Sequence, residues 1–283
     1  MTIELRHLRA FLAIAEEDNV TRAAARLHLS QPALSRILRQ LEDHLGARLA
    51  DRSTHHFVLT TEGRTFRDKA LAAVSAVESA LDPRGLRAWP LRLSHTWPAL
   101  GDHTIPLLRR WDERHPGTPL DLLRIDDRTA GLTQGRADAA LLRGGAVPDG
   151  FRAELLTVEE RVAVMAADSP LAALPIVTPS DLAAHPLALN TVSGTTTLDL
   201  WPLDARPASV IEVTNTDEWL VVIAAGRAAG VSTSATPSNH THPSLVYRPL
   251  AGVPAVPVHL VWPYGPAHPA IPDLLALARE ILT

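Results

Sequence analysis

The sequence contains no cysteine and no long hydrophobic run. Without thiols there is no disulfide scaffold, no thiolate zinc site, no iron–sulfur cluster and no cysteine nucleophile. The longest apolar candidate, residues 219–231, is short and contains Arg227, so we expect no membrane-spanning helix. The amino terminus carries Glu4, Arg6 and Arg9 ahead of any apolar run and is not typical of a signal peptide. We therefore expect a cytoplasmic protein with no membrane partner.

A large excess of charge of one sign is also lacking. The formal net charge is −4 over 283 residues, which argues against a uniformly basic surface for nucleic acids. The positive charge is local: residues 19–58 hold 6 arginines against Glu42, Asp43 and Asp51. The hydrophobic fraction of 46% is ordinary for a folded protein.

The distribution of proline indicates a domain boundary. Pro32 is the only proline before residue 82, and the other 22 follow it. The sequence Asp82-Pro83-Arg84-Gly85 lies at this change and is typical of a break in secondary structure. We predict an amino-terminal domain over 1–60, a linker or dimerisation helix over 61–82, a hinge over 83–88 and a second domain over 89–283.

The amino-terminal part shows the spacing of short helices. Leu5, Leu8 and Leu12 recur at helical intervals. A second helix is expected over Arg22–Leu27 with Thr21 as its N-cap. A third is expected from Ser30, its N-cap, to Gly46, with Pro32 in the first turn. We expect a β-hairpin within 47–60 and a long helix over Thr61–Leu81.

The long helix has a single narrow apolar stripe, formed by Phe66, Ala70, Val74, Val77 and Leu81. Such a stripe is usually buried against a second copy or a neighbouring helix. Packing against its own domain is the alternative.

Two short helices followed by a hairpin describe a winged helix-turn-helix. The second of these helices is expected to enter the major groove of double-stranded DNA. Gln31, Ser35 and Arg36 lie at its start, where glutamine can read adenine and arginine can read guanine. The residues expected to contact DNA are Thr21, Arg22, Ser30, Gln31, Pro32, Ser35, Arg36, Arg39, Arg52, Ser53 and Thr54. For any single arginine, a solvated surface position is the alternative, and for the whole segment it is a helical bundle without a DNA role.

Beyond residue 88, strand-like and helical stretches alternate, which predicts an α/β domain with mostly parallel sheets. The expected strands are Leu91–Ser94, Leu120–Ile125, Ala139–Leu142, Arg161–Met165, Leu187–Leu189, Val210–Val213, Gly230–Ser232 and Val258–Trp262. The expected helices include Gly101–Arg114, Asp126–Gly135, Thr216–Gly226 and Pro272–Leu282.

The segment Ala23-Ala24-Ala25-Arg26-Leu27-His28-Leu29-Ser30-Gln31-Pro32-Ala33-Leu34-Ser35, with Leu59-Thr60-Thr61-Glu62-Gly63, resembles the signature of LysR-type transcriptional regulators. The resemblance covers residues 3–65. It continues more weakly through Gly135-Arg136-Ala137-Asp138, Pro179-Ser180-Asp181-Leu182 and Val222–Ser232. One departure is Ala50, where the family usually has phenylalanine, which reduces the hydrophobic packing under the hairpin.

The resemblance implies a mixed fold: a winged helix-turn-helix, a linker helix and a carboxy-terminal, two-lobed α/β domain like the periplasmic binding proteins. Lobe I would span about 89–160 and 250–283, and lobe II about 161–249, with crossing strands near 160–165 and 245–250. A small-molecule effector would bind in the cleft, and the chain would form a homodimer or a homotetramer of two dimers. No cofactor and no metal is expected.

Ligands of α/β folds bind beyond the carboxyl ends of strands, where helix amino termini offer free N–H groups. Hydroxyl-rich segments follow several predicted strands here. Capping and turn chemistry is the alternative for each hydroxyl, and a surface position is the alternative for Arg143. The residues expected to contact an effector are Ser94, His95, Thr96, Trp97, Arg143, Ser193, Thr195, Thr196, Thr214, Thr216 and Ser232.

These expectations favour a sequence-specific DNA-binding transcriptional regulator controlled by an effector. One alternative is a cytoplasmic solute-binding module without a DNA role. Another is an enzyme that uses the cleft, which would require His95 to lie beside Ser193 and Asp217. Common signatures of zinc proteases, serine hydrolases and phosphate loops are missing, and the pair His240 and His242 is a weak indication of a metal site.

Overall fold

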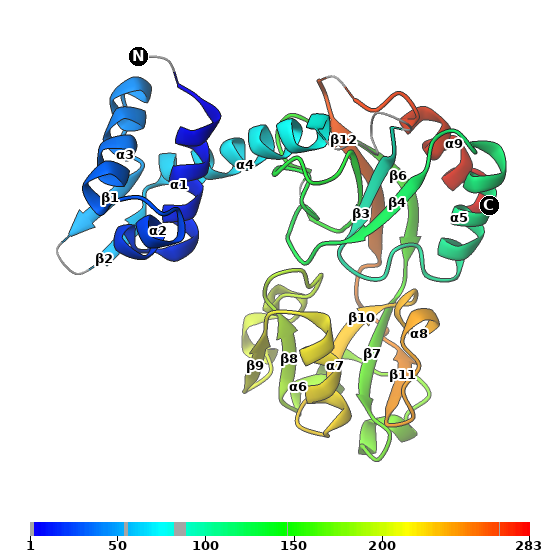
Figure 1. Cartoon of the computed structure of the whole chain (residues 1–283). Helices are drawn as coiled ribbons and strands as arrows, with labels where there is room; N and C mark the ends of the chain where they lie inside the picture. The colour runs from blue at the N-terminus through cyan, green and yellow to red at the C-terminus, as the bar shows by residue number, and fades with distance from the viewer. Residues whose placement is uncertain (1–2, 54–55, 82–88, 146, 266) are drawn as a thin grey trace. The chain divides into compact units, whose positions relative to one another are not determined.

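The computed structural model describes residues 3–53, 56–81, 89–145, 147–265 and 267–283. It divides into two compact units, shown in Figure 1. One contains Met1–Arg87 with Thr133–Arg136, and the other contains Ala88–Leu132 with Ala137–Thr283. The expected hinge at 83–88 lies outside the described residues.

The described part of the first unit consists of three helices, a hairpin and a long helix. Its elements are α1 (Leu5–Glu17), α2 (Val20–Arg26), α3 (Gln31–Leu45), β1 (Ala50–Ser53), β2 (His56–Leu59) and α4 (Thr61–Leu81). The two strands pair antiparallel. The expected winged helix-turn-helix and the expected long helix over Thr61–Leu81 are thus confirmed.

The helix ends follow from capping chemistry, with one correction. Ser30 caps α3, and Gly46 ends it in the left-handed conformation, as predicted. The predicted N-cap Thr21 is wrong, because Asn19 caps α2. Its Oδ1 accepts hydrogen bonds from the backbone N–H groups of Thr21 and Arg22, at 2.8 and 3.0 Å. One asparagine thus satisfies two free donors of the first turn, and α2 begins at Val20.

The core of this unit explains the packing of α4. Phe66 on α4 lies edge-on to Phe11 on α1, with ring centroids 5.0 Å apart, and Ala70 and Val74 of the stripe are buried in the same core. The end of the stripe is different, since Leu81 is 72% exposed. The first half of the stripe therefore packs on its own domain, and the last turn leaves apolar surface in this chain uncovered.

The first sheet of the second unit has five strands in the order β4-β3-β5-β12-β6. One face is covered by α5 and α9, whose buried side chains share a core with the sheet, including the fully buried Trp111. The elements are β3 (Leu91–His95), η1 (Gly101–His103), α5 (Thr104–Arg114), β4 (Leu120–Arg124), β5 (Ala139–Arg143), β6 (Phe151–Glu159), β12 (Val256–Pro263) and α9 (Ile271–Leu282).

The other strands of this unit form a three-stranded sheet, β10-β7-β11, and the parallel pair β8-β9. Apolar clusters lie around these strands, one of them containing Trp219 and Ile223 of helix α7. The elements are β7 (Arg161–Ala166), η2 (Pro170–Ala173), α6 (Pro179–Ala183), β8 (Leu187–Asn190), η3 (Leu198–Leu200), η4 (Leu203–Ala205), β9 (Val210–Val213), α7 (Thr216–Ala224), β10 (Gly230–Thr233), α8 (Thr236–Asn239) and β11 (Leu245–Pro249).

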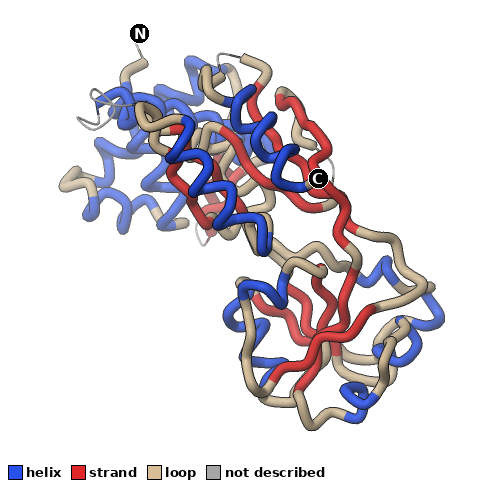
Figure 2. The backbone as a smooth tube through the Cα atoms, turned by 90° about the vertical axis from the view of Figure 1, so that its right-hand side faces the viewer, coloured by secondary structure: helices blue, strands red, loops and turns tan. Residues whose placement is uncertain are grey.

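The chain connects the two sheets twice, once from β6 to β7 through Glu160 and once from β11 to β12. Figure 2 shows these strand segments running between the two parts of the second unit. The two sheets thus belong to two lobes joined by two crossings.

The expectation of mostly parallel sheets is wrong. Strand β3 is parallel to β4 and β5, but β12 is antiparallel to β5 and β6, and β7 is antiparallel to both its neighbours. The strand β6 was not expected. Buried and exposed positions do not alternate regularly along Phe151–Glu159, so the sequence lacks the pattern typical of a strand. The antiparallel pairing arises because β12 returns from the other lobe rather than through a crossover helix.

The expected helix over Asp126–Gly135 is also wrong, since this segment forms turns. Three of its residues have positive φ, namely Ala130, Gly131 and Gly135, which a right-handed helix excludes. The carboxylate of Asp127 stabilises the turn by accepting hydrogen bonds from the backbone N–H groups of Thr129 and Gly131. A side chain that bonds to nearby backbone competes with the helix.

Candidate DNA interface and ligand cavity

Helix α3 presents a polar face to solvent at its start. Leu34, Leu38 and Leu41 are buried in the core of the first unit, which directs the opposite face outward. Gln31, Pro32, Arg36 and Arg39 are exposed, and Ser35 is half-buried. The face consists of Gln31, Pro32, Ser35, Arg36 and Arg39, and we name it the α3 face.

The polar groups of the α3 face are held to different extents. Gln31 Nε2 donates to Ser35 Oγ at 3.2 Å, and Arg39 Nε donates to the Ser35 carbonyl at 3.4 Å. Arg36 has neither a hydrogen bond nor an ion pair within the described part of the chain. Its guanidinium is therefore available to an outside acceptor.

The arginines of α2 are already paired. Arg22 donates to the Glu17 carbonyl and lies 3.5 Å from its carboxylate. Arg26 contacts both Glu16 and Glu17, at 2.6 and 3.3 Å. Arg22, predicted to contact phosphates, would have to exchange this pairing for one with DNA. These pairs are exposed, so the exchange costs little.

Other polar residues near the predicted DNA-binding helix and the hairpin are exposed. Arg48, which precedes β1, is exposed, and no ion pair of its guanidinium is found within the described residues. Arg48 was not among the residues predicted to contact DNA, although it lies beside the predicted hairpin. Thr21 and Ser30 are exposed as well. Thr54 and the side chains of Arg52 and Ser53 lie outside the described residues.

The second unit contains a cavity at the ends of several strands. Contributions come from β5, from the segment after β3, from β8 and the loop that follows it, from α7 and from β10. The lining residues are Trp97, Arg143, Ala188, Leu189, Asn190, Ser193, Gly194, Thr195, Thr196, Thr216, Trp219, Val231, Ser232 and Thr233.

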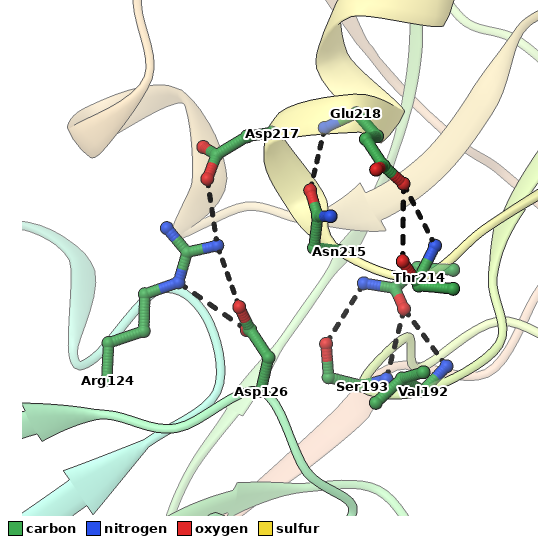
Figure 3. Close-up of polar contacts among 9 residues, drawn as sticks. Arg124, Asp126, Val192, Ser193, Thr214, Asn215, Asp217 and Glu218 are labelled. Carbon is green, nitrogen blue, oxygen red and sulfur yellow. Dashed lines mark hydrogen bonds and ion pairs between the residues drawn. The ribbon is translucent and has the colours of Figure 1, made fainter. Parts of the chain in front are cut away.

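The loop after β8 is organised by one amide. Asn190 Nδ2 donates to Ser193 Oγ at 2.9 Å, and its Oδ1 accepts from the backbone N–H groups of Val192 and Ser193 (Figure 3). Gly194 lies so close to the Asn190 carbonyl that an added Cβ would stand 2.3 Å from its oxygen. The loop therefore needs glycine at this position.

Arg161 holds the far end of the same loop. Its Nη1 donates to Thr196 Oγ1 at 3.2 Å and its Nη2 to the Thr195 carbonyl at 3.1 Å. Burial lowers the pKa of Arg161 from its ordinary value. Thr195 and Thr196 are thus fixed by a guanidinium on β7.

Arg143 is buried, so the surface alternative for this residue is wrong. Its Nε and Nη2 donate to the Glu159 carboxylate at 2.9 and 2.7 Å, and Nη2 also donates to the Ala99 carbonyl at 2.7 Å. The side chains are 1% and 9% exposed. Arg143 Nη1 has no hydrogen-bond partner among the described residues, nor do Trp97 Nε1 and Thr233 Oγ1.

The cavity brings together most, but not all, of the residues predicted to contact an effector. Ser94 Oγ donates to the Ala139 carbonyl inside the sheet, and Thr214 bonds to Glu218 (Figure 3). The predicted residues that line it are Trp97, Arg143, Ser193, Thr195, Thr196, Thr216 and Ser232, and those that do not are Ser94, His95, Thr96 and Thr214. Sequence reasoning missed Asn190, Trp219 and Thr233.

An ion pair connects the lobes near the cavity (Figure 3). Arg124, the last residue of β4, lies 3.2 Å from the carboxylate of Asp217 on α7 and 3.1 Å from Asp126. Its guanidinium lies 4.9 Å from the ring centroid of Trp97, and His240 packs on the same indole at 3.3 Å. Trp97 is therefore fixed between groups of two lobes.

The arrangement required by the enzyme alternative is not found among the described residues. Ser193 Oγ accepts from Asn190, and Asp217 pairs with Arg124. His95 Nδ1 is buried and has no hydrogen-bond partner there. No nucleophile and base are thus joined through His95. The described residues also contain no group of three or more side chains that could hold a metal ion.

We expect His95 to make the second unit sensitive to acid. Burial, and then the charges of Arg143 and Arg124, lower the pKa of His95 to about 4. Between pH 6.5, the usual value, and about 4, the unfolded chain binds the proton and the folded chain does not, so the stability falls as the pH falls. His95→Asn should flatten the melting temperature against pH in this window and leave the curves parallel above pH 7. An unchanged slope would contradict this assignment.

Two parts of the chain match models of one protein family. Residues 84–283 match the family model described as "LysR substrate binding domain", and residues 5–64 match "Bacterial regulatory helix-turn-helix protein, lysR family". No helix of the described residues has the length and apolar character needed to cross a bilayer.

Curated relatives and solved structures agree with these matches. The Escherichia coli regulator YnfL, an uncharacterised HTH-type transcriptional regulator, is 37% identical over 66% of this chain and 65% of its own length. The Escherichia coli Hca operon transcriptional activator HcaR is 28% identical over 99% and 98%. The crystal structure of CbnR, a LysR family transcriptional regulator, has a TM-score of 0.66 at 20% identity over 99% and 100%. These relatives are transcriptional regulators, not enzymes.

Proposed function

Because the chain belongs to the family of LysR-type transcriptional regulators, which combine a DNA-binding domain with an effector-binding domain, we propose that it binds specific DNA sequences through the α3 face. The observation that carries this proposal is the outward position of the first two turns of α3, where Arg36 has no partner within the described residues. A buried first turn would be unable to reach base edges.

The roles of the α3 residues follow from their chemistry. Gln31 and Arg36 can each form paired hydrogen bonds with base edges, which distinguish one base pair from another. Arg39, Ser30 and Thr21 are exposed and suit phosphate contacts, which set the position of the protein without reading sequence. Arg48 supplies a further cation beside the hairpin.

The second part of the proposal is control by a small molecule bound in the cavity between the lobes. Its support is the group of buried polar atoms without partners on residues that line this cavity, because native proteins seldom leave such atoms unsatisfied. A ligand that binds one arrangement of the lobes better than another shifts the population toward it. Such a shift would alter the spacing of the DNA-binding units.

The third part is a homodimer formed through the exposed end of the α4 stripe, where Val77 and Leu81 are exposed. A symmetric pair places two recognition helices about 34 Å apart, one turn of DNA. Two such dimers would form a homotetramer.

The experiment that tests the DNA role is affinity selection of genomic fragments with the purified full chain, followed by sequencing. We expect recovery of a small set of sites that share a short motif, with retention that weakens as salt rises. Recovery of fragments at random, or none, would favour the alternative of a solute-binding module. The neighbouring genes then supply candidate effectors, and a ligand that changes the footprint on a recovered site supports control through the cavity.

A further inference from the structure

The chemistry of the cavity indicates the class of ligand. Three of its lining residues carry a buried polar atom with no partner among the described residues: Trp97 Nε1, Arg143 Nη1 and Thr233 Oγ1. Arg143 and Thr233 are 9% and 2% exposed. Two of the three atoms can only donate hydrogen bonds, and the hydroxyl can do so as well. These three atoms therefore have no acceptor among the described residues.

The hydrogen bonds of Arg143 leave one nitrogen, Nη1, that only a bound ligand or water can satisfy. The Glu159 carboxylate occupies Nε and Nη2, and the Ala99 carbonyl also accepts from Nη2. This bidentate pair fixes the plane of the guanidinium. Its remaining nitrogen, Nη1, then has a set direction and no acceptor in the described chain. A buried donor left in this state destabilises the unliganded protein.

The charge around the cavity favours an anion over a neutral acceptor. Among the described residues, no aspartate or glutamate lines it. Glu159 balances Arg143, but the hydrogen bonds of Arg161 go to three neutral oxygens, those of Thr195, Thr196 and Pro254. The charge of Arg161 is thus not balanced by a carboxylate in direct contact among the described residues. Burial is the main cause of the lowered pKa of His95, and the charges of Arg143 and Arg124 add to it.

The remaining lining residues include apolar side chains that a ligand would contact. Ala188, Leu189, Trp219 and Val231 provide apolar surface, as is typical of ligand sites with a few polar groups. A carboxylate is flat and presents two acceptor oxygens, which suits a guanidinium nitrogen and an indole N–H. A short apolar body would then lie against Trp219.

We infer that the effector is a small monocarboxylate, whose carboxylate supplies the acceptors for Arg143 Nη1 and Trp97 Nε1 and bonds to the Thr233 hydroxyl. This inference rests on the proposed function, because it assigns a chemical class to the ligand of the same cavity. The carboxylate completes the hydrogen bonding of all three groups, and it brings a negative charge to a lining without a carboxylate among the described residues. The amide of the same acid lacks the charge and keeps one acceptor oxygen.

Thr233→Val provides the sharpest variant. Valine has nearly the shape of threonine, so the change removes an unpartnered buried hydroxyl and should raise the melting temperature of the free protein. The same change should weaken binding of the acid about tenfold. Thr236→Val is the matched control: Thr236 is fully buried, but its hydroxyl bonds to Ser232 Oγ at 2.6 Å, so this variant should melt lower than the wild type.

The binding experiment uses the full chain and a panel of aliphatic and aromatic monocarboxylates, each paired with its primary amide. Thermal shift identifies binders, and the indole N–H signal of Trp97, assigned with Trp97→Phe in the ¹⁵N-labelled protein, reports the contact directly. We expect at least one acid to raise the melting temperature and to move the Trp97 signal, with at least tenfold tighter binding than its amide.

The outcomes separate the inference from the function on which it rests. Amides that bind as well as their acids, with loss of binding in Thr233→Val, would overturn the carboxylate and keep the cavity as the effector site. A panel in which no acid shifts the melting temperature would likewise overturn the inference. Acids that bind equally to the wild type, Thr233→Val and Trp97→Phe would overturn both the inference and the proposed cavity.

Discussion

Glu159→Gln is expected to lower the free energy of unfolding of the second unit by about 3–5 kcal/mol. Glu159 and Arg143 form a bidentate pair whose side chains are 9% and 1% exposed. Removing the negative charge leaves the guanidinium buried without a counter-ion in contact. The low exposure of the two side chains limits compensation by water.

The measurement is denaturant unfolding followed by tryptophan fluorescence. All six tryptophans of the chain lie at or beyond residue 89, so the signal reports the second unit and is blind to the first. A lower midpoint with an unchanged slope corresponds to a loss of stability rather than a change in compactness.

Glu154→Gln is the matched control for this prediction. Its carboxylate pairs with Arg279 at the same distance, 2.7 Å, but the side chains are 47% and 52% exposed. Exposed pairs contribute about 0–1 kcal/mol, so this variant should unfold almost as the wild type does. Equal losses in the two variants would show that burial does not determine the strength of the Arg143–Glu159 pair.

The features of the fold that follow from the sequence alone are local ones. The cap at Ser30 and the end of α3 at Gly46 were predicted correctly, because capping depends on one side chain and its nearest backbone. The strand β6 and the turns over 126–135 were not, because pairing with β12 and the side-chain bonds of Asp127 override weak local preferences. Local chemistry thus sets the ends of elements, and long-range pairing decides which elements form.

The ligand cavity shows the same division. Hydroxyls that follow strands, such as Thr195 and Ser232, were found because the carboxyl ends of strands are readable in the sequence. Trp219 was missed because its place depends on the rotation of α7. The partner of Arg143 is 16 residues away on another strand, and no spacing rule connects the two.

Gln31→Ala combined with Arg36→Ala is expected to weaken binding to the specific DNA site by about 2–6 kcal/mol per half-site, since each paired contact with a base edge contributes about 1–3 kcal/mol. Binding to unrelated DNA should change far less, because phosphate contacts dominate it. Arg39→Ala should instead weaken both kinds of binding and reduce the dependence on salt.

Fluorescence anisotropy with a recovered site and a scrambled duplex, each over a range of salt concentrations, separates these two effects. Arg67→Ala is the control, because Arg67 is a half-buried arginine of α4 that pairs with Asp68, outside the α3 face. Gln31 and Arg36 lie on the same face as Arg39, so only a difference in what they contact can make their variants behave differently. If the double variant loses affinity equally for both duplexes, the α3 face binds phosphates and sequence is read elsewhere. If it loses affinity for neither, α3 is not the recognition helix.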